Sequence, residues 1–250
     1  MSSSIAARLG HLRVRRSKAA TNRRPDRPIS ATSGTPAAAS ANRPAEAIGE
    51  ASRPNAIDPD EALARLIASN ARYVTDAPIS KDLSVGRAAR AAAQHPIACI
   101  GGCADARVAP DSVFDQGPGD LFVVRVAANF ENTDGLASPE YGVQVLGAPL
   151  IVVLGHSDCG AVKATIDVMK TNAALPGHLP ALIDAIRPAV NLAEKARAPD
   201  PLAEVIAQNV RHSVHCLEQA GPIIAEAITR KHVKVVGGFY DIATGRVALL

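Results

Sequence analysis

Four apolar runs of strand length recur along the chain, at 97–102, 121–127, 149–155 and 233–240. Each run is apolar at consecutive positions rather than at alternate ones, and segments with helical periodicity separate the runs. Strands with this pattern are typical of a parallel sheet that helices cover on both faces. The sequence therefore predicts an α/β fold: a mostly parallel four-stranded sheet, with a possible short fifth strand, flanked by helices.

The first helix is predicted by apolar periodicity together with a capping signal. Asp58 is placed as the N-cap and Pro59 at the first helical position, and apolar residues follow at helical spacing from Leu63 to Val74. An Ala-rich second helix is expected over 84–94. Further helices are expected over 138–147 (with Ser138 as cap and Pro139 at its first position), 158–170, 179–197, 201–219 and 222–231.

Residues 1–55 differ from the rest of the chain in composition and in charge. They are rich in Ser, Ala, Arg, Asn and Pro and have almost no large apolar residue after Val14, so we expect a disordered basic leader. Of the net charge of +3, the first 25 residues contribute +7, so the remainder of the chain carries −4. We therefore predict a leader over 1–55 and a single folded domain over 56–250.

Composition excludes several classes of partner and location. The longest apolar runs are less than half of the ~20 residues that cross a bilayer, so no transmembrane span is expected. The charge of the body gives no reason to expect a nucleic-acid-binding surface. Four cysteines without a secretory signal indicate a reducing compartment, where metal binding or catalysis is their expected use. The expected location is the cytoplasm, and the alternative is an organelle, because the Arg-rich leader resembles a transit peptide.

Metal-binding side chains follow two of the predicted strands. The first strand runs into Cys103, Asp105 and Arg107, and the third runs into His156 and Cys159. In an open parallel sheet, ligands bind beyond the carboxyl ends of the strands. Two thiolates and an imidazole are the ligand set that zinc prefers. Each of these residues alone reads more simply as a core or capping residue, but their convergence at adjacent strand ends favours a metal site.

The fourth coordination position is open to alternatives. A structural zinc site is normally closed by four Cys or His ligands, and neither loop offers a fourth one. Water or the carboxylate of Asp105 remains, and Arg107 can take that carboxylate away in a bidentate pair. Because Cys159 lies near the start of a helix, we expect the helix dipole to lower its thiol pKa. Gly160, which follows it, allows close approach of a ligand to the backbone.

With these residues in view, the chain resembles the beta-class carbonic anhydrases, whose signature is Cys-x-Asp-x-Arg followed later in the chain by His-x-x-Cys. The resemblance covers about 57–250. It extends through ALARLIASNARYV (62–74), GCADARVAP (102–110), FDQGPGDLFVVRVAAN (114–129), SPEYGVQVLGAPLIVVLGHSDCGAV (138–162) and GGFYDIATGRV (237–247). It implies one zinc ion on Cys103, His156 and Cys159, a catalytic pair of Asp105 and Arg107, and a homodimer or homotetramer whose N-terminal helix packs on a partner.

The implied reaction is the reversible hydration of carbon dioxide to bicarbonate and a proton. Alternatives are hydrolysis of carbonyl sulfide or carbon disulfide on the same fold, or a non-catalytic bicarbonate- or zinc-binding module. The intact Asp105 and Arg107 argue against the last of these, because zinc storage does not need a switchable carboxylate. We expect an apolar substrate pocket lined by Val108, Phe122, Val126 and Ala128.

Some positions depart from the commoner family pattern. Ala104 and Ala106 replace small hydroxyl residues, Val126 stands where Asn is usual, and Ala128 where Gly is usual. Two other groups of metal-binding residue types are expected to be structural. His212, His215 and Cys216 lie within a helix with an apolar stripe, and Cys99 lies inside the first strand.

Overall fold

The computed structural model describes residues 57–79, 81 and 86–250, and the expected leader over 1–55 lies outside that part of the chain. The helices are α1 (Pro59–Val74), α2 (Arg87–Ala92), α3 (Pro110–Val113), α4 (Thr133–Gln144), α5 (Gly160–Thr171), α6 (Leu179–Ala196), α7 (Pro201–Glu218) and α8 (Ile223–Thr229), with a 3₁₀ turn η2 (Ala127–Asn129). The strands are β1 (Ala98–Cys103), β2 (Leu121–Val126), β3 (Leu150–His156), β4 (Lys234–Tyr240) and β5 (Val247–Leu249). Within the described ranges, no helix combines the length and apolar character needed to cross a membrane.

The five strands form one sheet in the order β2-β1-β3-β4-β5. The first four strands are parallel, and the short β5 pairs antiparallel with β4. All residues of β1 and β3 are buried, whereas β2 lies at an edge and is half-buried. The predicted fold class is confirmed, and so is the fifth strand.

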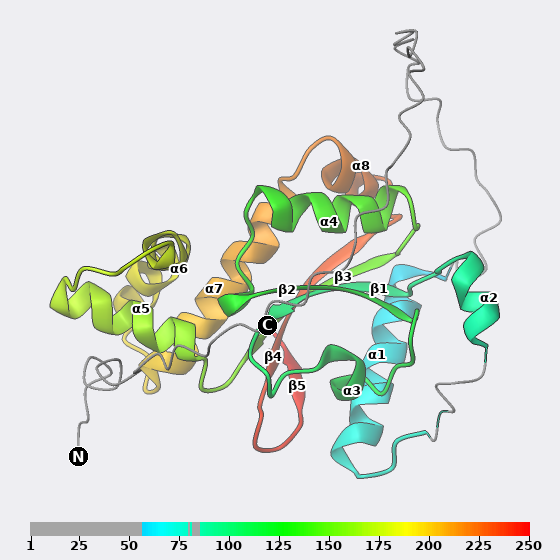
Figure 1. The fold of residues 1–250 in the computed structure, drawn as a ribbon, viewed down its shortest axis with the longest axis horizontal. Coiled ribbons are helices and arrows are strands. Elements are labelled where there is room, and N and C mark those ends of the chain that lie inside the picture. Colours follow the sequence, from blue (N-terminus) through cyan, green and yellow to red (C-terminus); the bar gives the residue numbers. More distant parts are fainter. Residues whose placement is uncertain (1–56, 80, 82–85) are drawn as a thin grey trace, which may run out of the picture. The chain divides into compact units, whose positions relative to one another are not determined.

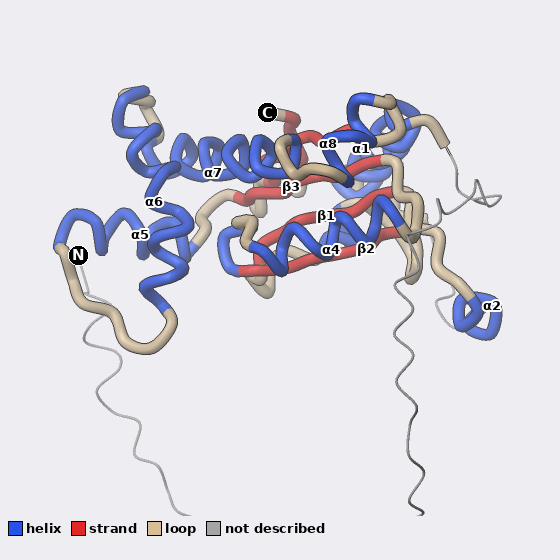
Figure 2. Tube along the Cα trace, turned by 90° about the horizontal axis from the view of Figure 1, so that it is seen from above, coloured by secondary structure: helices blue, strands red, loops and turns tan. Residues whose placement is uncertain are grey.

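Helices cover both faces of this sheet, and alternate residues of β1 divide between them. Ile100 belongs to the apolar cluster that α1 and α3 complete on one face. Cys99 packs on the opposite face, in the cluster that contains residues of α4, α7 and α8. Figure 1 shows α5 and α6 side by side at one end of the strands, and Figure 2 shows α4 running alongside β1 and β2.

Helix α1 begins as the sequence predicts and is tied to the rest of the fold by a buried amide. The Asp58 side chain accepts a hydrogen bond from the backbone N–H of Asp60 at 2.8 Å. One turn before the C-terminal end, Asn70 donates through Nδ2 to the carbonyls of Val113 and Gly245, each at 2.9 Å. Because these partners belong to α3 and to the segment before β5, Asn70 joins three elements distant in sequence.

Helix α4 begins earlier than the sequence pattern indicated. Its N-cap is Asn132, whose side chain accepts a hydrogen bond from the backbone N–H of Gly135 at 2.7 Å. The expected start at Ser138 is wrong, because Ser138 and Pro139 lie inside the helix. Proline has no backbone N–H, so residue 139 makes no α-helical hydrogen bond to the carbonyl of Gly135, four residues earlier.

Helix α7 lies very close to the sheet because two strands carry glycine beneath it. A Cβ atom at Gly155 on β3 would lie 2.6 Å from Val210 Cγ2, and one at Gly237 on β4 would lie 2.8 Å from Val210 Cγ1. Val210 is fully buried between them. This contact fixes the distance of α7 from the carboxyl end of β3, where the expected metal ligands lie.

Candidate metal centre

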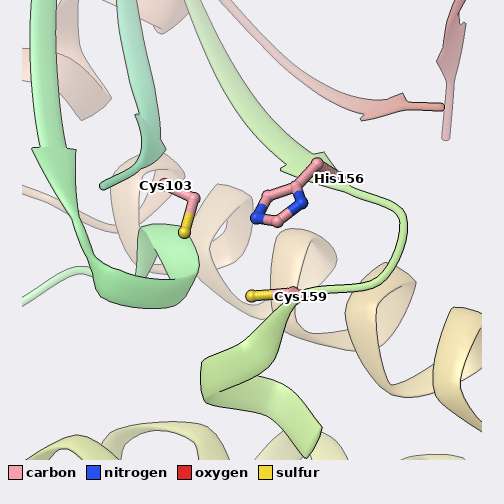
Figure 3. Close-up of side chains that lie close together, drawn as sticks. All are labelled: Cys103, His156 and Cys159. Carbon is pink, nitrogen blue, oxygen red and sulfur yellow. The ribbon is translucent and has the colours of Figure 1, made fainter. Parts of the chain in front are cut away.

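The three expected metal ligands converge at the carboxyl ends of two neighbouring strands. Cys103 ends β1, His156 ends β3, and Cys159 is the N-cap residue of α5. Their donor atoms all lie within 4.8 Å of one another, and all three residues are buried. Figure 3 shows the two sulfur atoms and the imidazole ring facing the same space. In the described part of the chain, this is the group whose geometry suits a metal ion.

The hydrogen bonding of His156 leaves one ring nitrogen available for a metal. Nδ1 lies 2.9 Å from the carbonyl oxygen of Ser157, so this nitrogen carries the proton and donates it. Nε2 therefore keeps its lone pair, and it is buried without a hydrogen-bond partner among the described residues. A buried, unpartnered imidazole nitrogen facing two cysteine sulfurs fits zinc by both geometry and chemistry.

The two thiols differ in acidity in the metal-free chain, and not in the direction expected. A hydrogen bond from Cys159 lowers the pKa of Cys103 to about 4, helped by the neighbouring His156 and by the backbone N–H groups of Asp105 and Ala128. Those N–H groups lie 3.4 and 3.2 Å from Cys103 Sγ. The pKa of Cys159 is raised instead of lowered, because its thiol donates a hydrogen bond to Cys103 and so retains its proton. The nearby thiolate thus outweighs the helix N-terminus.

Asp105 and Arg107 form a bidentate ion pair beside the three ligands. Arg107 donates through Nε to Asp105 Oδ1 at 2.9 Å and through Nη2 to Oδ2 at 2.7 Å. These bonds hold the pKa of Asp105 well below its usual range. Asp105 Oδ2 lies 4.0 Å from His156 Nε2. The carboxylate is therefore ionised and next to the metal position while it is engaged by Arg107.

Sequence reasoning missed Arg125, which holds the loop between the ligand and the ion pair. From β2 it donates through Nε to the carbonyl of Cys103 at 2.9 Å and through Nη2 to that of Asp105 at 2.6 Å. The available signal was an arginine inside an otherwise apolar strand run. Because both carbonyls are fixed, the backbone between Cys103 and Asp105 has little freedom to move.

The expected pocket residues do not all reach the site. Gly160 is exposed, and a Cβ atom built on it would meet nothing within 4 Å, so open space adjoins the first turn of α5. Val126 pairs in register with Cys103 and is half-buried. Val108 was wrongly assigned to the pocket, because it packs in the α1 cluster on the opposite face. Phe122 packs under α4, with its ring centroid 6.1 Å from that of Tyr141.

The residues expected to be structural take no part in the centre. Cys99 is buried in β1, and burial raises the pKa of its thiol to about 12. His212 Nε2 lies 3.9 Å from Cys216 Sγ on α7, and no described residue completes a metal site with them.

Comparisons with known proteins agree with this arrangement. The family model described as carbonic anhydrase matches residues 98–247. A carbonic anhydrase of Mycolicibacterium smegmatis is 39% identical over 181 residues, which are 72% of this chain and 87% of that protein. Carbonic anhydrase 2 of Mycobacterium tuberculosis is 39% identical over 184 residues, with the same coverage of both chains. A solved structure from Sordaria macrospora, described as one of two tetrameric beta-carbonic anhydrases, aligns with a TM-score of 0.60 and 26% identity over 76% of this chain and 97% of that one.

Proposed function

Since this chain belongs to the beta-class carbonic anhydrase family, we propose that Cys103, His156 and Cys159 hold one zinc ion per chain. The family reaction is the reversible hydration of carbon dioxide to bicarbonate and a proton, and the chain is an enzyme of this class. The observation that carries the zinc assignment is the unpartnered Nε2 of His156, buried and facing two sulfur atoms. When bound, zinc is a Lewis acid that acidifies water and so makes a nucleophile available near neutral pH.

Asp105 orients the nucleophile in this proposal. An ionised carboxylate only accepts hydrogen bonds, and each oxygen can accept more than one. Oδ2 receives Arg107 and still has a lone pair for a water molecule at the neighbouring metal position. Asp105 would accept the O–H of the nucleophile in this way and so orient it toward the substrate.

Arg107 keeps the carboxylate in that role. Without its two hydrogen bonds, Asp105 is free to enter the ligand group as a fourth ligand and to close the site. A third contact steadies the guanidinium, since Arg107 Nη2 also lies 3.4 Å from the carbonyl oxygen of Asp158. Arg107 therefore keeps Asp105 out of the ligand group and leaves the fourth coordination position open.

The substrate approaches from the side of Gly160 and Val126 in this proposal. The absence of a side chain at Gly160 leaves open space at the first turn of α5. Val126 adds an apolar surface beside Cys103, which suits a small molecule without a dipole.

Paired cysteine variants test the zinc assignment. Cys103 and Cys99 are both buried in β1, but only Cys103 belongs to the ligand group. Elemental analysis is expected to find one zinc per chain in the wild type and in Cys99→Ala, and none retained in Cys103→Ala. Stopped-flow hydration of carbon dioxide should follow the zinc content. Full zinc and full turnover in Cys103→Ala would overturn the assignment.

Neither alternative activity has a specific observation in its favour. Assaying carbonyl sulfide hydrolysis on the same zinc-loaded sample distinguishes the hydrolase from the carbonic anhydrase. A protein that binds zinc and turns over neither substrate would be the non-catalytic module.

We also propose that the enzyme is a homodimer or homotetramer. Among the described residues, no strand pairs with the outer side of the edge strand β2. Tyr141 on the adjacent α4 and Val145 at its C-cap are about half exposed, at 47% and 50%. Burial of such apolar surface against a second copy is favourable. Light scattering at assay concentration tests this, and a fully active monomer would contradict it.

Residues 1–54 of the leader are proposed to be dispensable for the zinc-binding domain over 56–250. A truncated chain that starts at Asn55 should bind zinc and turn over carbon dioxide as the full chain does. Loss of either property in a folded truncated chain would show that the leader contributes. We propose a cytoplasmic location, with organellar targeting through the Arg-rich leader as the alternative that cell fractionation distinguishes.

A further inference from the structure

The turn that follows β2 holds an alanine in a backbone conformation that alanine does not favour. Ala128 has φ 62° and ψ 21°, and Asn129 has φ 47°. Asparagine adopts the left-handed region more readily than most residues, but for alanine it is costly and persists only when the surroundings hold it. Both residues are buried, so solvent does not supply those contacts.

This turn delivers a hydrogen bond to a proposed zinc ligand. The backbone N–H of Ala128 donates to Cys103 Sγ at 3.2 Å. An N–H donor stabilises a thiolate and fixes the direction of its remaining lone pairs. The conformation at Ala128 therefore bears directly on how Cys103 presents its sulfur.

Two buried side chains of α7 hold the turn from the other side. Asn209 Nδ2 donates to the carbonyl of Ala128 at 2.7 Å, and Ser213 Oγ donates to the carbonyl of Asn129 at 3.2 Å. Both side chains are 1% exposed and lie one helical turn apart on the same face of α7. Within the described residues, the bond to Ala128 is the hydrogen bond that the Asn209 amide makes, because its Oδ1 has no partner there.

The packing of α7 on the sheet fixes where the Asn209 and Ser213 side chains lie. Val210, next to Asn209, is seated between Gly155 and Gly237, where added Cβ atoms would lie 2.6 and 2.8 Å from its methyl groups. The helix therefore cannot slide over the sheet without a clash, and its donors remain opposite the two carbonyls.

We propose that Asn209 and Ser213 are positioning residues of the zinc site, which hold the Ala128 turn so that its N–H donates to Cys103. They touch neither the metal position nor substrate and act through the backbone of the turn. The inference rests on the proposed zinc site and adds to it a contact from α7, 106 positions beyond Cys103 for Asn209.

Zinc affinity, measured by competition with a chelator, tests the inference on the full chain. Loss of a residue that orients a metal ligand weakens metal binding about 10- to 100-fold, and we expect this for Asn209→Ala and a smaller loss for Ser213→Ala. Leu217→Ala is the matched control. Leu217 is buried on the same helix, but it packs in the cluster that contains Cys99 and not in the one that contains Cys103 and Ala128. This variant should destabilise the fold and leave zinc affinity unchanged.

A cobalt-substituted sample gives a second readout that a purely structural role would not move. Removing an N–H donor raises the electron density on Cys103 Sγ, so the sulfur-to-cobalt charge-transfer band should shift to longer wavelength in Asn209→Ala. Leu217→Ala should keep the wild-type band.

Rescue by Ala128→Gly completes the test. Glycine adopts positive φ without strain, so the turn should form without the hold from α7. Ala128→Gly should therefore restore part of the zinc affinity that Asn209→Ala loses. Ser213→Ala, which removes a single hydroxyl, keeps the test available where Asn209→Ala does not fold.

Two results would overturn the inference, and each is distinct from failure of the zinc site itself. One is wild-type zinc affinity and an unshifted cobalt band in folded Asn209→Ala or Ser213→Ala. The other is an equal loss of affinity in Leu217→Ala. If instead the wild-type chain binds no zinc through Cys103, the proposed site is at fault.

Discussion

Replacing Glu131 by glutamine should stabilise the protein most above pH 7 and have almost no effect below pH 4. The carboxyl group occupies a space that two glycines leave open, since added Cβ atoms at Gly101 and Gly135 would lie 3.2 and 2.9 Å from its oxygens. Among the described residues, nothing forms a hydrogen bond or an ion pair with it. Burial alone raises its pKa from 4.5 to about 7.

The size and sign of the effect follow from that shift. Between pH 4.5 and 7 the folded chain holds a proton that the unfolded chain has released, so stability falls as pH rises. Each unit of pKa difference is worth 1.36 kcal/mol, so the full shift corresponds to about 3 kcal/mol. Below 4.5 both states are protonated, and the contribution vanishes. Glutamine is neutral throughout and removes this dependence.

Urea unfolding from pH 5 to 8.5 measures the effect as the difference between Glu131→Gln and wild type. That difference should grow from about 1 kcal/mol at pH 5 to about 3 kcal/mol at pH 8.5, and contributions common to both proteins cancel in it. Glu218→Gln, which alters an exposed carboxylate on α7, should show no such growth. A difference that does not vary with pH would refute the reasoning from burial.

Three further predictions concern the site and its support. Asp105→Asn should keep zinc but lower kcat in stopped-flow assays, because the amide is a weaker acceptor for the nucleophile; undiminished kcat would contradict its role. Wild-type kcat should climb from pH 6.5 to 8.5, and Asp105 is not the group that titrates there, because Arg107 holds its pKa well below its usual range; a flat profile with zinc fully occupied would oppose this. Gly155→Ala should lower the thermal midpoint, because the added methyl group would overpack against Val210 and lower the free energy of unfolding by about 1–3 kcal/mol. Val210→Ala should then cost less in that background than in wild type, whereas simply additive losses would argue against the contact.

The sheet and the metal ligands could be read from the sequence because their signals are local. Consecutive apolar positions marked β1 and β3, and Cys103 and His156 follow directly at the strand ends. In a parallel sheet these ends share one edge, so adjacency along each strand becomes proximity in space. The pairing of Asp105 with Arg107 is equally local, since only Ala106 lies between them.

The errors arose where one local signal admits two structures. Pro139 is compatible with the first position of a helix, but the earlier capping signal of Asn132 prevails, and the proline lies within α4. Val108 is apolar and close to the signature, yet its side chain turns to the α1 face. The side on which a loop residue packs is set by tertiary contacts that periodicity does not encode.

The acidity of the two thiols and the hold on the Ala128 turn depend on residues distant in the chain, which is why sequence reasoning missed both. A helix N-terminus beside Cys159 gave a local reason for a low pKa, and the N–H groups of Ala161 and Val162 do act in that direction, but the hydrogen bond to Cys103 outweighs them. Ala128, whose N–H donates to Cys103, is contacted by Asn209 from α7. The candidate ligands are therefore contained in two short motifs, whereas the turn that donates to Cys103 depends on a contact from α7 that no local pattern indicates.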